Sequence, residues 1–433
     1  MKKESIARGL IAFSLPLILS GVLQQLYNWV DAFIVGHVCG QLAMGSVGAT
    51  TTSVNLFVTV ITGFTLGLNV LMAQRHGAGE DEALPKLLSL WTRWLGGAFL
   101  LVGAAGCVLA GALLELLDTP DTMLALSTDY LSIIFVGMPF LAVYNVYSAA
   151  LRALGDSRAP FLAVAVSSGV NVVLDILLVA VVPWGVRGAA IATVCSQAAM
   201  TVFIVLYARR RYPILRCPVL GRVESLWLRE GLSYGLPPML QSSIGALGSL
   251  VLQSFMNSFG DGTVTAITTA YRVDTIILLP IINLGSAIST LTAHACGAGD
   301  EARARRIYAV GSALMAVVSL LLTGIILPAG EPLIALFGAE TDVVDIGRAF
   351  FWRIAPFYIV YGLATAARGH IEGRGDMVFS AGVGIAALAL RIAASYALRP
   401  LMGEAVIAYA EAFCWLLMLA LYVLRVRLRR RAA

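Results

Sequence analysis

The sequence predicts an all-α polytopic membrane protein in which twelve transmembrane helices form two pseudo-symmetric six-helix lobes. Three observations predict this fold class: the composition, the spacing of long apolar stretches and an internal duplication. Of the 433 residues, 59% are hydrophobic and only 13% are charged. Soluble domains carry roughly 25% charged residues. The composition therefore excludes an ordinary soluble protein, and its apolar content also excludes a disordered chain.

Apolar segments long enough to cross a membrane fill almost the whole chain. A spanning helix needs about 20 predominantly apolar residues, so we divided the sequence wherever polar residues or Gly and Pro clusters interrupt such stretches. Almost continuously apolar runs, such as 313–327, favour helices over β-barrel strands, which alternate every second residue. The twelve predicted spans cover residues 12–38, 46–73, 88–114, 124–150, 160–182, 188–208, 232–258, 264–293, 307–328, 343–366, 377–400 and 405–425.

The basic residues predict how these spans are oriented. Most of the 30 Lys and Arg residues lie on one side, at the N-terminus, after every second span and in the C-terminal tail. Cytoplasmic loops are enriched in Lys and Arg. We therefore expect a multi-pass protein of the plasma or inner membrane with both termini in the cytoplasm. We attribute these charges to topology rather than to nucleic-acid binding or to contacts with specific lipids.

The two halves of the chain repeat each other. The run at residues 73–80 recurs at 293–300, an offset of 220 (293 minus 73), and Gly155-Asp156 recurs at the same offset as Gly375-Asp376. Six spans in each half give both halves the same orientation, an arrangement typical of transporters. We predict an N-lobe with spans 1–6, a cytoplasmic inter-lobe linker, and a C-lobe with spans 7–12 and the basic tail. These parts cover residues 1–208, 209–230 and 231–433.

Few ionisable residues fall inside the spans of the first half. Asp31 lies in span 1 and Asp175 in span 5, where each charge costs roughly 2.5–3.5 kcal/mol at the membrane centre. Asn171 precedes Asp175 by four residues, and Gln24 and Asn28 precede Asp31 at helical spacing. Residues three and four apart share one helix face. The sequence thus predicts one polar stripe on each of two otherwise apolar helices.

Two buried carboxylates from different helices suit either of two functions. Burial and mutual repulsion favour their protonated form and permit reversible protonation. Alternatively, Asp31, Asn171, Asp175 and the Thr193 hydroxyl supply the oxygen ligands that a small cation such as Na⁺ prefers. A third possibility is a structural clamp in which the side chains only hydrogen-bond between helices. The four histidines lack metal-ligand spacing, so we expect no metal site built on them.

The second half lacks this acidic pair. At the 220 offset, Arg391 replaces Asn171 and Ser395 replaces Asp175. Asp274 or Glu411 is then expected to neutralise Arg391, with substrate contact by Arg391 and Asp274 as the alternative. No Walker-type, H-E-x-x-H or G-x-S-x-G motif occurs, which disfavours ATP-driven transport and the familiar hydrolases. We therefore expect neither an enzyme nor a cofactor.

Several runs in order resemble the multidrug and toxic compound extrusion (MATE) transporters of the DinF-like branch, over essentially the whole chain. The runs are V-D-x-F-I-V-G, A-Q-x-x-G-A-G, R-A-L-G-D, N-x-x-L-D and G-x-x-G-A-A-x-A-T, at residues 30–36, 73–79, 152–156, 171–175 and 185–193. The resemblance implies a V-shaped pair of six-helix lobes. It also implies a monomer that exports organic, often cationic and amphipathic, compounds through alternating access by antiport with H⁺ or Na⁺.

The resemblance also implies roles for particular residues. Aspartates matching Asp31 and Asp175 bind the coupling ion, with polar neighbours that match Gln24, Asn171 and Thr193. Tyr130 corresponds to a cavity tyrosine, and Pro16 to the proline at which the first helix bends. Spans 7 and 10 lack the acidic residues of the second-lobe cation site in the NorM-like branch. Two alternatives stay open: a lipid-linked glycan flippase of the same superfamily, for which Arg272, Arg353 and Arg391 could bind diphosphate, and an intramembrane enzyme or receptor.

Overall fold

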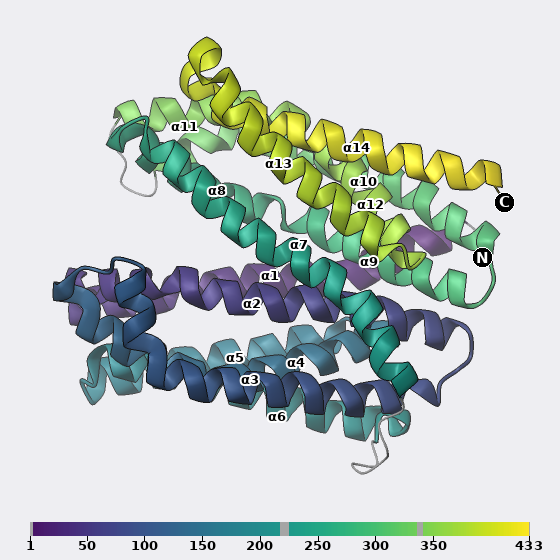
Figure 1. Ribbon diagram of the computed structural model, residues 1–433, viewed down its shortest axis with the longest axis horizontal. Helices are drawn as coiled ribbons and strands as arrows, with labels where there is room; N and C mark the ends of the chain where they lie inside the picture. The colour runs from purple at the N-terminus through teal and green to yellow at the C-terminus, as the bar shows by residue number, and fades with distance from the viewer. Residues whose placement is uncertain (1–2, 217–224, 336–340, 433) are drawn as a thin grey trace. The chain divides into compact units, whose positions relative to one another are not determined.

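Nearly all of the residues that the structure describes lie in helices. The computed structural model (Figure 1) describes residues 3–216, 225–335 and 341–432, and these residues contain no β-strand. The all-α prediction is therefore confirmed. The α-helices are α1 (Lys3–Cys39), α2 (Gln41–Gly77), α3 (Ala83–Leu116), α4 (Asp121–Ala153), α5 (Arg158–Asp175), α6 (Gly185–Arg211), α7 (Ser225–Asn257), α8 (Asp261–Ile277), α9 (Leu279–Gly297), α10 (Glu301–Ala335), α11 (Thr341–Ile354), α12 (Tyr358–Gly373), α13 (Met377–Met402) and α14 (Val406–Ala432).

Each predicted span coincides with one of these helices or with two consecutive ones. Within the described residues, nine helical stretches are long and apolar enough to cross a membrane, and ten if α8 and α9 count as one span bent by 41°. One of these stretches, Met377–Arg429, contains both α13 and α14. Helix α7 is not among the stretches and corresponds to the predicted span 232–258. The bend between α8 and α9 has a local cause, because Pro280 in the first turn of α9 cannot continue the hydrogen-bond ladder.

The helices form two compact units whose limits cross two helices. One unit comprises Leu19–Gly235, and the other comprises Met1–Ile18 together with Leu236–Ala433. The start of α1 thus belongs with the second half of the chain, and the start of α7 belongs with the first half. Both divisions lie within three residues of a helix-interior proline, Pro16 in α1 and Pro237 in α7, where one backbone hydrogen bond is missing. Residues 217–224 of the predicted linker, including Cys217, lie outside the described residues.

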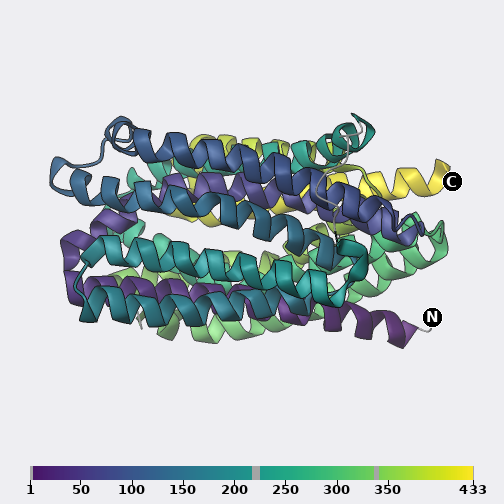
Figure 2. The ribbon, with the colours of Figure 1, turned by 90° about the horizontal axis from the view of Figure 1, so that it is seen from below.

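Helix α4 is the centre of the first unit. It contacts α2, α3 and α6, and α5 in turn contacts α6. Figures 1 and 2 show α3 and α4 lying side by side along most of their length. Leu131, Phe135 and Met138 of α4 are almost fully buried. Because α4 is packed from three sides, its side chains can meet those of the neighbouring helices inside the unit.

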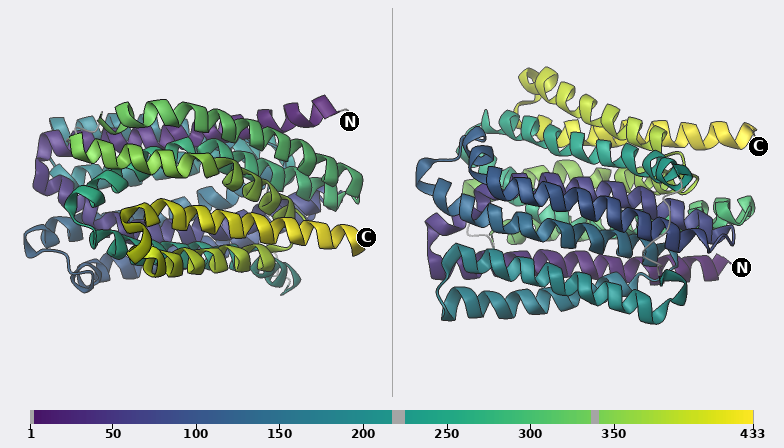
Figure 3. Two further views of the ribbon diagram at one scale, coloured as in Figure 1. Left: turned by 90° about the horizontal axis from the view of Figure 1, so that it is seen from above. Right: turned by 60° about the horizontal axis from the view of Figure 1, so that its bottom comes forward.

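Helix α12 has the corresponding place in the second unit. It contacts α9, α10 and α14, and α14 also contacts α13; Figure 3 shows α13 and α14 side by side. Tyr358 on α12 and Tyr422 on α14 are fully buried in its core. Leu10 and Phe13 from the start of α1 are buried in the same core, which accounts for the assignment of this segment to the second unit.

A glycine allows α2 to approach the start of α7. A Cβ atom at Gly67 would overlap the Tyr234 carbonyl group and lie 2.8 Å from the Cα atom of Gly235. Backbone atoms cannot move aside as a flexible side chain can, so we predict that Gly67→Ala destabilises the protein by about 1–3 kcal/mol. The free energy of unfolding, measured by SDS titration in mixed micelles, checks this value.

The control lies on the same helix. A Cβ atom at Gly48 meets no atom within 4 Å, so we expect Gly48→Ala to leave the stability unchanged or to raise it by up to about 1 kcal/mol, because alanine is the better helix former. Equal effects of the two substitutions would contradict the close contact between α2 and α7.

Candidate functional site

The carboxyl groups of Asp31 and Asp175 meet inside the first unit. Asp31 lies on α1 and is partly buried, whereas Asp175 ends α5 and is fully buried. Asp31 and Asp175 lie close enough for their carboxyl groups to interact with each other. Two ionised carboxylates are both acceptors and cannot hydrogen-bond to each other, whereas a pair that shares one proton can. Oδ1 of Asp31 and both oxygens of Asp175 are buried without a hydrogen-bond donor among the described residues.

Asn171 lies one helical turn before Asp175 and adds two further unpaired groups. Its side chain is 1% exposed, and neither its Oδ1 nor its Nδ2 atom has a partner in the described part of the chain. Buried polar atoms in proteins are nearly always hydrogen-bonded, and an exception calls for an explanation. Five such atoms in three neighbouring side chains make this the candidate site for the coupling ion.

Asp175 lies at the point where the helix changes from the α to the π type. Directly after it, the α-helix continues as a π-helical segment, Ile176–Val181. Beyond the end of the segment, the Trp184 backbone N–H donates to the Leu178 carbonyl oxygen at 2.9 Å, and Gly188 at the start of α6 packs against the same carbonyl group. Short π-helical turns are rare and occur frequently at functional sites. This junction holds the Asp175 carboxyl group at the point where the regular helix stops.

Some of the other predicted site residues lie close to the carboxyl pair, and others do not. Tyr130 on α4 is buried, and the Thr193 side chain on α6 lies close to its hydroxyl group. Tyr130 also lies close enough to Asp31 and Asp175 to interact with both electrostatically. Gln24 and Asn28 of α1 are exposed, although they share a face with Asp31. The carboxyl pair therefore receives polar neighbours from α4 and α5, and Thr193 of α6 lies beside Tyr130.

Sequence reasoning missed Tyr27. It lies one turn before Asp31 on α1, close to the Gln24 side chain, and is near enough to Asp31 and Asp175 to interact with their charges. Its i, i+4 spacing from Asp31 was visible in the sequence. We did not single it out because a tyrosine in an apolar span is also an ordinary packing residue. Through Tyr27, Gln24 is joined indirectly to the carboxyl pair.

The charge of Arg391 is neutralised within the second unit. Arg391 donates a 2.9 Å hydrogen bond to the Glu411 carboxylate and a 2.8 Å bond to the Tyr271 hydroxyl, which itself donates to Glu411 over 3.3 Å. Asp274 is 4% exposed and accepts a short hydrogen bond from Tyr358. Of the two partners expected for Arg391, the structure therefore selects Glu411.

A further buried network was not predicted. The predicted span 343–366 ends before Arg368, but α12 continues to Gly373, and Arg368 pairs with Glu372 at 2.6 Å within that helix. Glu372 also accepts a 2.8 Å bond from the Ser380 hydroxyl, and Arg368 donates to Gln241 of α7 over 3.4 Å. The i, i+4 spacing of Arg368 and Glu372 was the available signal.

Comparison with known proteins identifies the family. The model of the family described as MatE matches residues 16–177 and again residues 237–397, more than half of the chain. The chain belongs to the MatE family. The resemblance to MATE transporters is thus confirmed, whereas the DinF-like branch stays a prediction. Among curated relatives, the probable multidrug resistance protein YpnP of Bacillus subtilis is 30% identical over 86% of this chain and 84% of its own.

Other relatives and solved structures agree. The multidrug export protein MepA of Staphylococcus aureus is 21% identical over 99% of this chain and 96% of its own. A MATE family transporter of the MOP superfamily in an outward-facing conformation has a TM-score of 0.89 at 19% identity, covering 100% of this chain and 98% of its own. A MATE structure in the bent conformation has a TM-score of 0.91 at the same identity, with the same coverage. This MatE protein therefore has the fold of the family and is a multi-pass membrane protein.

Proposed function

We propose that this MatE protein exports organic compounds across the cell membrane by antiport with H⁺ or Na⁺. The family consists of transporters, and the relatives reported above are called multidrug resistance or multidrug export proteins. The observation that carries the coupling to an ion is the pair Asp31 and Asp175, whose buried oxygens lack donors among the described residues. No cofactor is required, because the ion gradient supplies the free energy.

The carboxyl pair suits both candidate ions. A proton between Asp31 and Asp175 gives the pair the hydrogen bond that two carboxylates cannot form. A sodium ion would instead take oxygen ligands from both carboxylates, from Asn171 and from the Thr193 hydroxyl. The described residues contain no group of three or more His, Cys, Asp or Glu side chains that could hold a metal ion. A sodium site would therefore depend on the neutral oxygens of Asn171 and Thr193.

Ion binding acts through the contact between α1 and α5. Without the ion, the two carboxylates repel each other at close range in a low-dielectric interior. With the ion bound, both carboxylates are attracted to it. The position of α1 therefore depends on ion occupancy, and Pro16 supplies a weak point in that helix. We propose that this movement alternates with release of the substrate. Entry of one positive charge adds about 2.3 kcal/mol per 100 mV, unless a cationic substrate leaves in exchange.

The remaining expectations belong to the same proposal. We assign the protein to the DinF-like branch, because its acidic pair lies in the first half, and we propose a monomer in the plasma or inner membrane with both termini cytoplasmic. A glycan flippase would need arginines that can bind a diphosphate. Arg391 is instead paired with Glu411, an arrangement that favours drug export over the flippase.

Transport by purified protein in liposomes tests the proposal. We expect ethidium to move across the membrane when a pH gradient or a sodium gradient is imposed alone, and the gradient that drives it identifies the coupling ion. Liposomes without protein and liposomes without a gradient are the controls. Absence of transport under both gradients, with ethidium, norfloxacin and tetraphenylphosphonium each tried as substrate, would contradict the proposal.

A further inference from the structure

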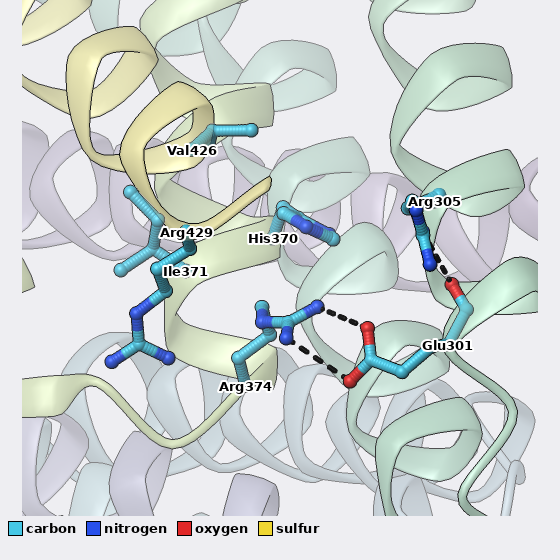
Figure 4. Close-up of a pocket in the computed structure, with 7 residues that line it drawn as sticks. All are labelled: Glu301, Arg305, His370, Ile371, Arg374, Val426 and Arg429. Carbon is cyan, nitrogen blue, oxygen red and sulfur yellow. Dashed lines mark hydrogen bonds and ion pairs between the residues drawn. The ribbon is translucent and has the colours of Figure 1, made fainter. Parts of the chain in front are cut away.

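A basic pocket lies at one end of the second unit, apart from the carboxyl pair. It is formed where α10 begins and where α12 and α14 end, and Figure 4 shows the lining residues: Glu301, Arg305, His370, Ile371, Arg374, Val426 and Arg429. These helix ends lie on the side that the positive-inside rule predicts to be cytoplasmic. Topology alone explains why these residues are basic, but not why they converge on a pocket.

The charges around the pocket do not balance. Arg374 binds Glu301 with both ends of its guanidinium group, at 2.7 and 3.0 Å, so these two charges cancel (Figure 4). Asp376 is shared by Arg425 and Arg429, at 2.9 and 2.8 Å, which leaves one positive charge in excess.

Arg305 supplies the second excess charge. Its side chain is exposed and donates only a weak 3.4 Å bond to the backbone carbonyl of Glu301, without a carboxylate partner among the described residues. Four guanidinium groups thus face two carboxylates. An excess of two positive charges, on donors that favour bidentate contacts, matches a phosphate group.

The other half of the chain provides an internal comparison. Asp156 occupies the position equivalent to Asp376, yet it accepts hydrogen bonds from the hydroxyls of Tyr207 and Tyr212, at 3.1 and 2.9 Å, and from two backbone N–H groups. No guanidinium pairs with it in the described residues. The same turn therefore forms without arginine, and the arginines around Asp376 are not required by the fold.

The pocket also has an apolar wall. Ile371 and Val426 are 2% and 7% exposed and line it together with the charged groups. Basic pockets between the ends of membrane helices bind anionic lipid headgroups. A free phosphate ion has no apolar portion to place against such a wall, whereas a phospholipid has. We propose that this pocket binds the phosphate group of an anionic phospholipid headgroup.

The test compares two pairs of substitutions. Arg305→Gln with Arg429→Gln removes the two excess charges but leaves Glu301 paired with Arg374 and Asp376 paired with Arg425, so the local ion pairs persist. Arg209→Gln with Arg210→Gln removes two exposed charges from the end of α6 in the other half and serves as the matched control. Native mass spectrometry of the full-length protein in detergent measures binding of dioleoyl-phosphatidylglycerol, with dioleoyl-phosphatidylcholine as the uncharged comparison and inorganic phosphate as competitor.

We expect phosphatidylglycerol to bind the wild type and the control pair equally, and to bind the Arg305→Gln/Arg429→Gln protein at least about tenfold more weakly, the effect of losing one charge-assisted contact. Equal binding to all three proteins would overturn the proposal. Equal binding of phosphatidylcholine would also overturn it, because the headgroup charge would then have no role. Full displacement by millimolar inorganic phosphate would show that the ligand is the free ion and not a lipid.

Discussion

Replacing Asp175 with Asn is expected to abolish gradient-driven efflux while the protein still folds and inserts. Asparagine keeps the shape of the side chain but cannot carry the negative charge that attracts the coupling ion. We expect transport of ethidium in proteoliposomes to fall to the level of protein-free vesicles. The asparagine amide can also donate a hydrogen bond to the Asp31 carboxylate, so the free energy of unfolding should change little.

Asp31→Asn should have the same effect on transport, because both carboxylates are needed to hold one ion between α1 and α5. Asp129→Asn is the matched control, since Asp129 forms a surface ion pair with Arg187, whose side chain is 66% exposed, and such pairs contribute little. We expect near-normal efflux from the control. Normal efflux from both the Asp31 and the Asp175 variants would contradict the proposal that these residues bind the coupling ion.

Breaking the buried Arg391–Glu411 ion pair of the second unit is expected to lower the stability of the protein. The Arg391 and Glu411 side chains are 21% and 11% exposed, so Glu411→Ala leaves a guanidinium with little access to water. Loss of one partner of a buried pair costs about 3–5 kcal/mol, and the partial exposure of Arg391 puts our expectation near the lower value. SDS titration of the purified protein measures the free energy of unfolding.

The double variant Arg391→Met/Glu411→Leu separates lost packing from uncompensated charge. Apolar residues of similar volume often replace a buried pair without loss of stability, so we expect the double variant to recover most of the stability that Glu411→Ala loses. Arg187→Met, which breaks the surface pair with Asp129, should change the stability by less than about 1 kcal/mol. A double variant as unstable as Glu411→Ala would contradict this account of the pair.

Periodicity in the sequence was sufficient to predict the helices and part of the site. Apolar length locates spans because a helix must satisfy its backbone within the membrane. Asn171 and Asp175 lie four residues apart in one helix, so their common face follows from the helical repeat alone. The meeting of Asp31 with Asp175 was inferred from the cost of burying each charge, and the structure brings the two groups together.

Contacts between distant helices were less predictable. Asp274 and Glu411 were equally plausible partners for Arg391, because the choice depends on how α8, α13 and α14 pack rather than on spacing within one helix. The π-helical segment after Asp175 has no sequence rule that would have located it. The assignment of residues 1–18 to the second unit also depends on tertiary packing, since Leu10 and Phe13 would suit any apolar core.

Ion release on substrate binding tests most directly the claim that Asp31 and Asp175 bind the coupling ion. Ethidium is added to the purified protein in two settings: weakly buffered solution with a pH indicator, and a solution equilibrated with ²²Na⁺. The account predicts that the wild type releases protons or sodium as ethidium binds, and that the Asp31→Asn/Asp175→Asn double variant releases neither. Equal ion release from the double variant and the wild type would show that the coupling ion binds elsewhere in the protein.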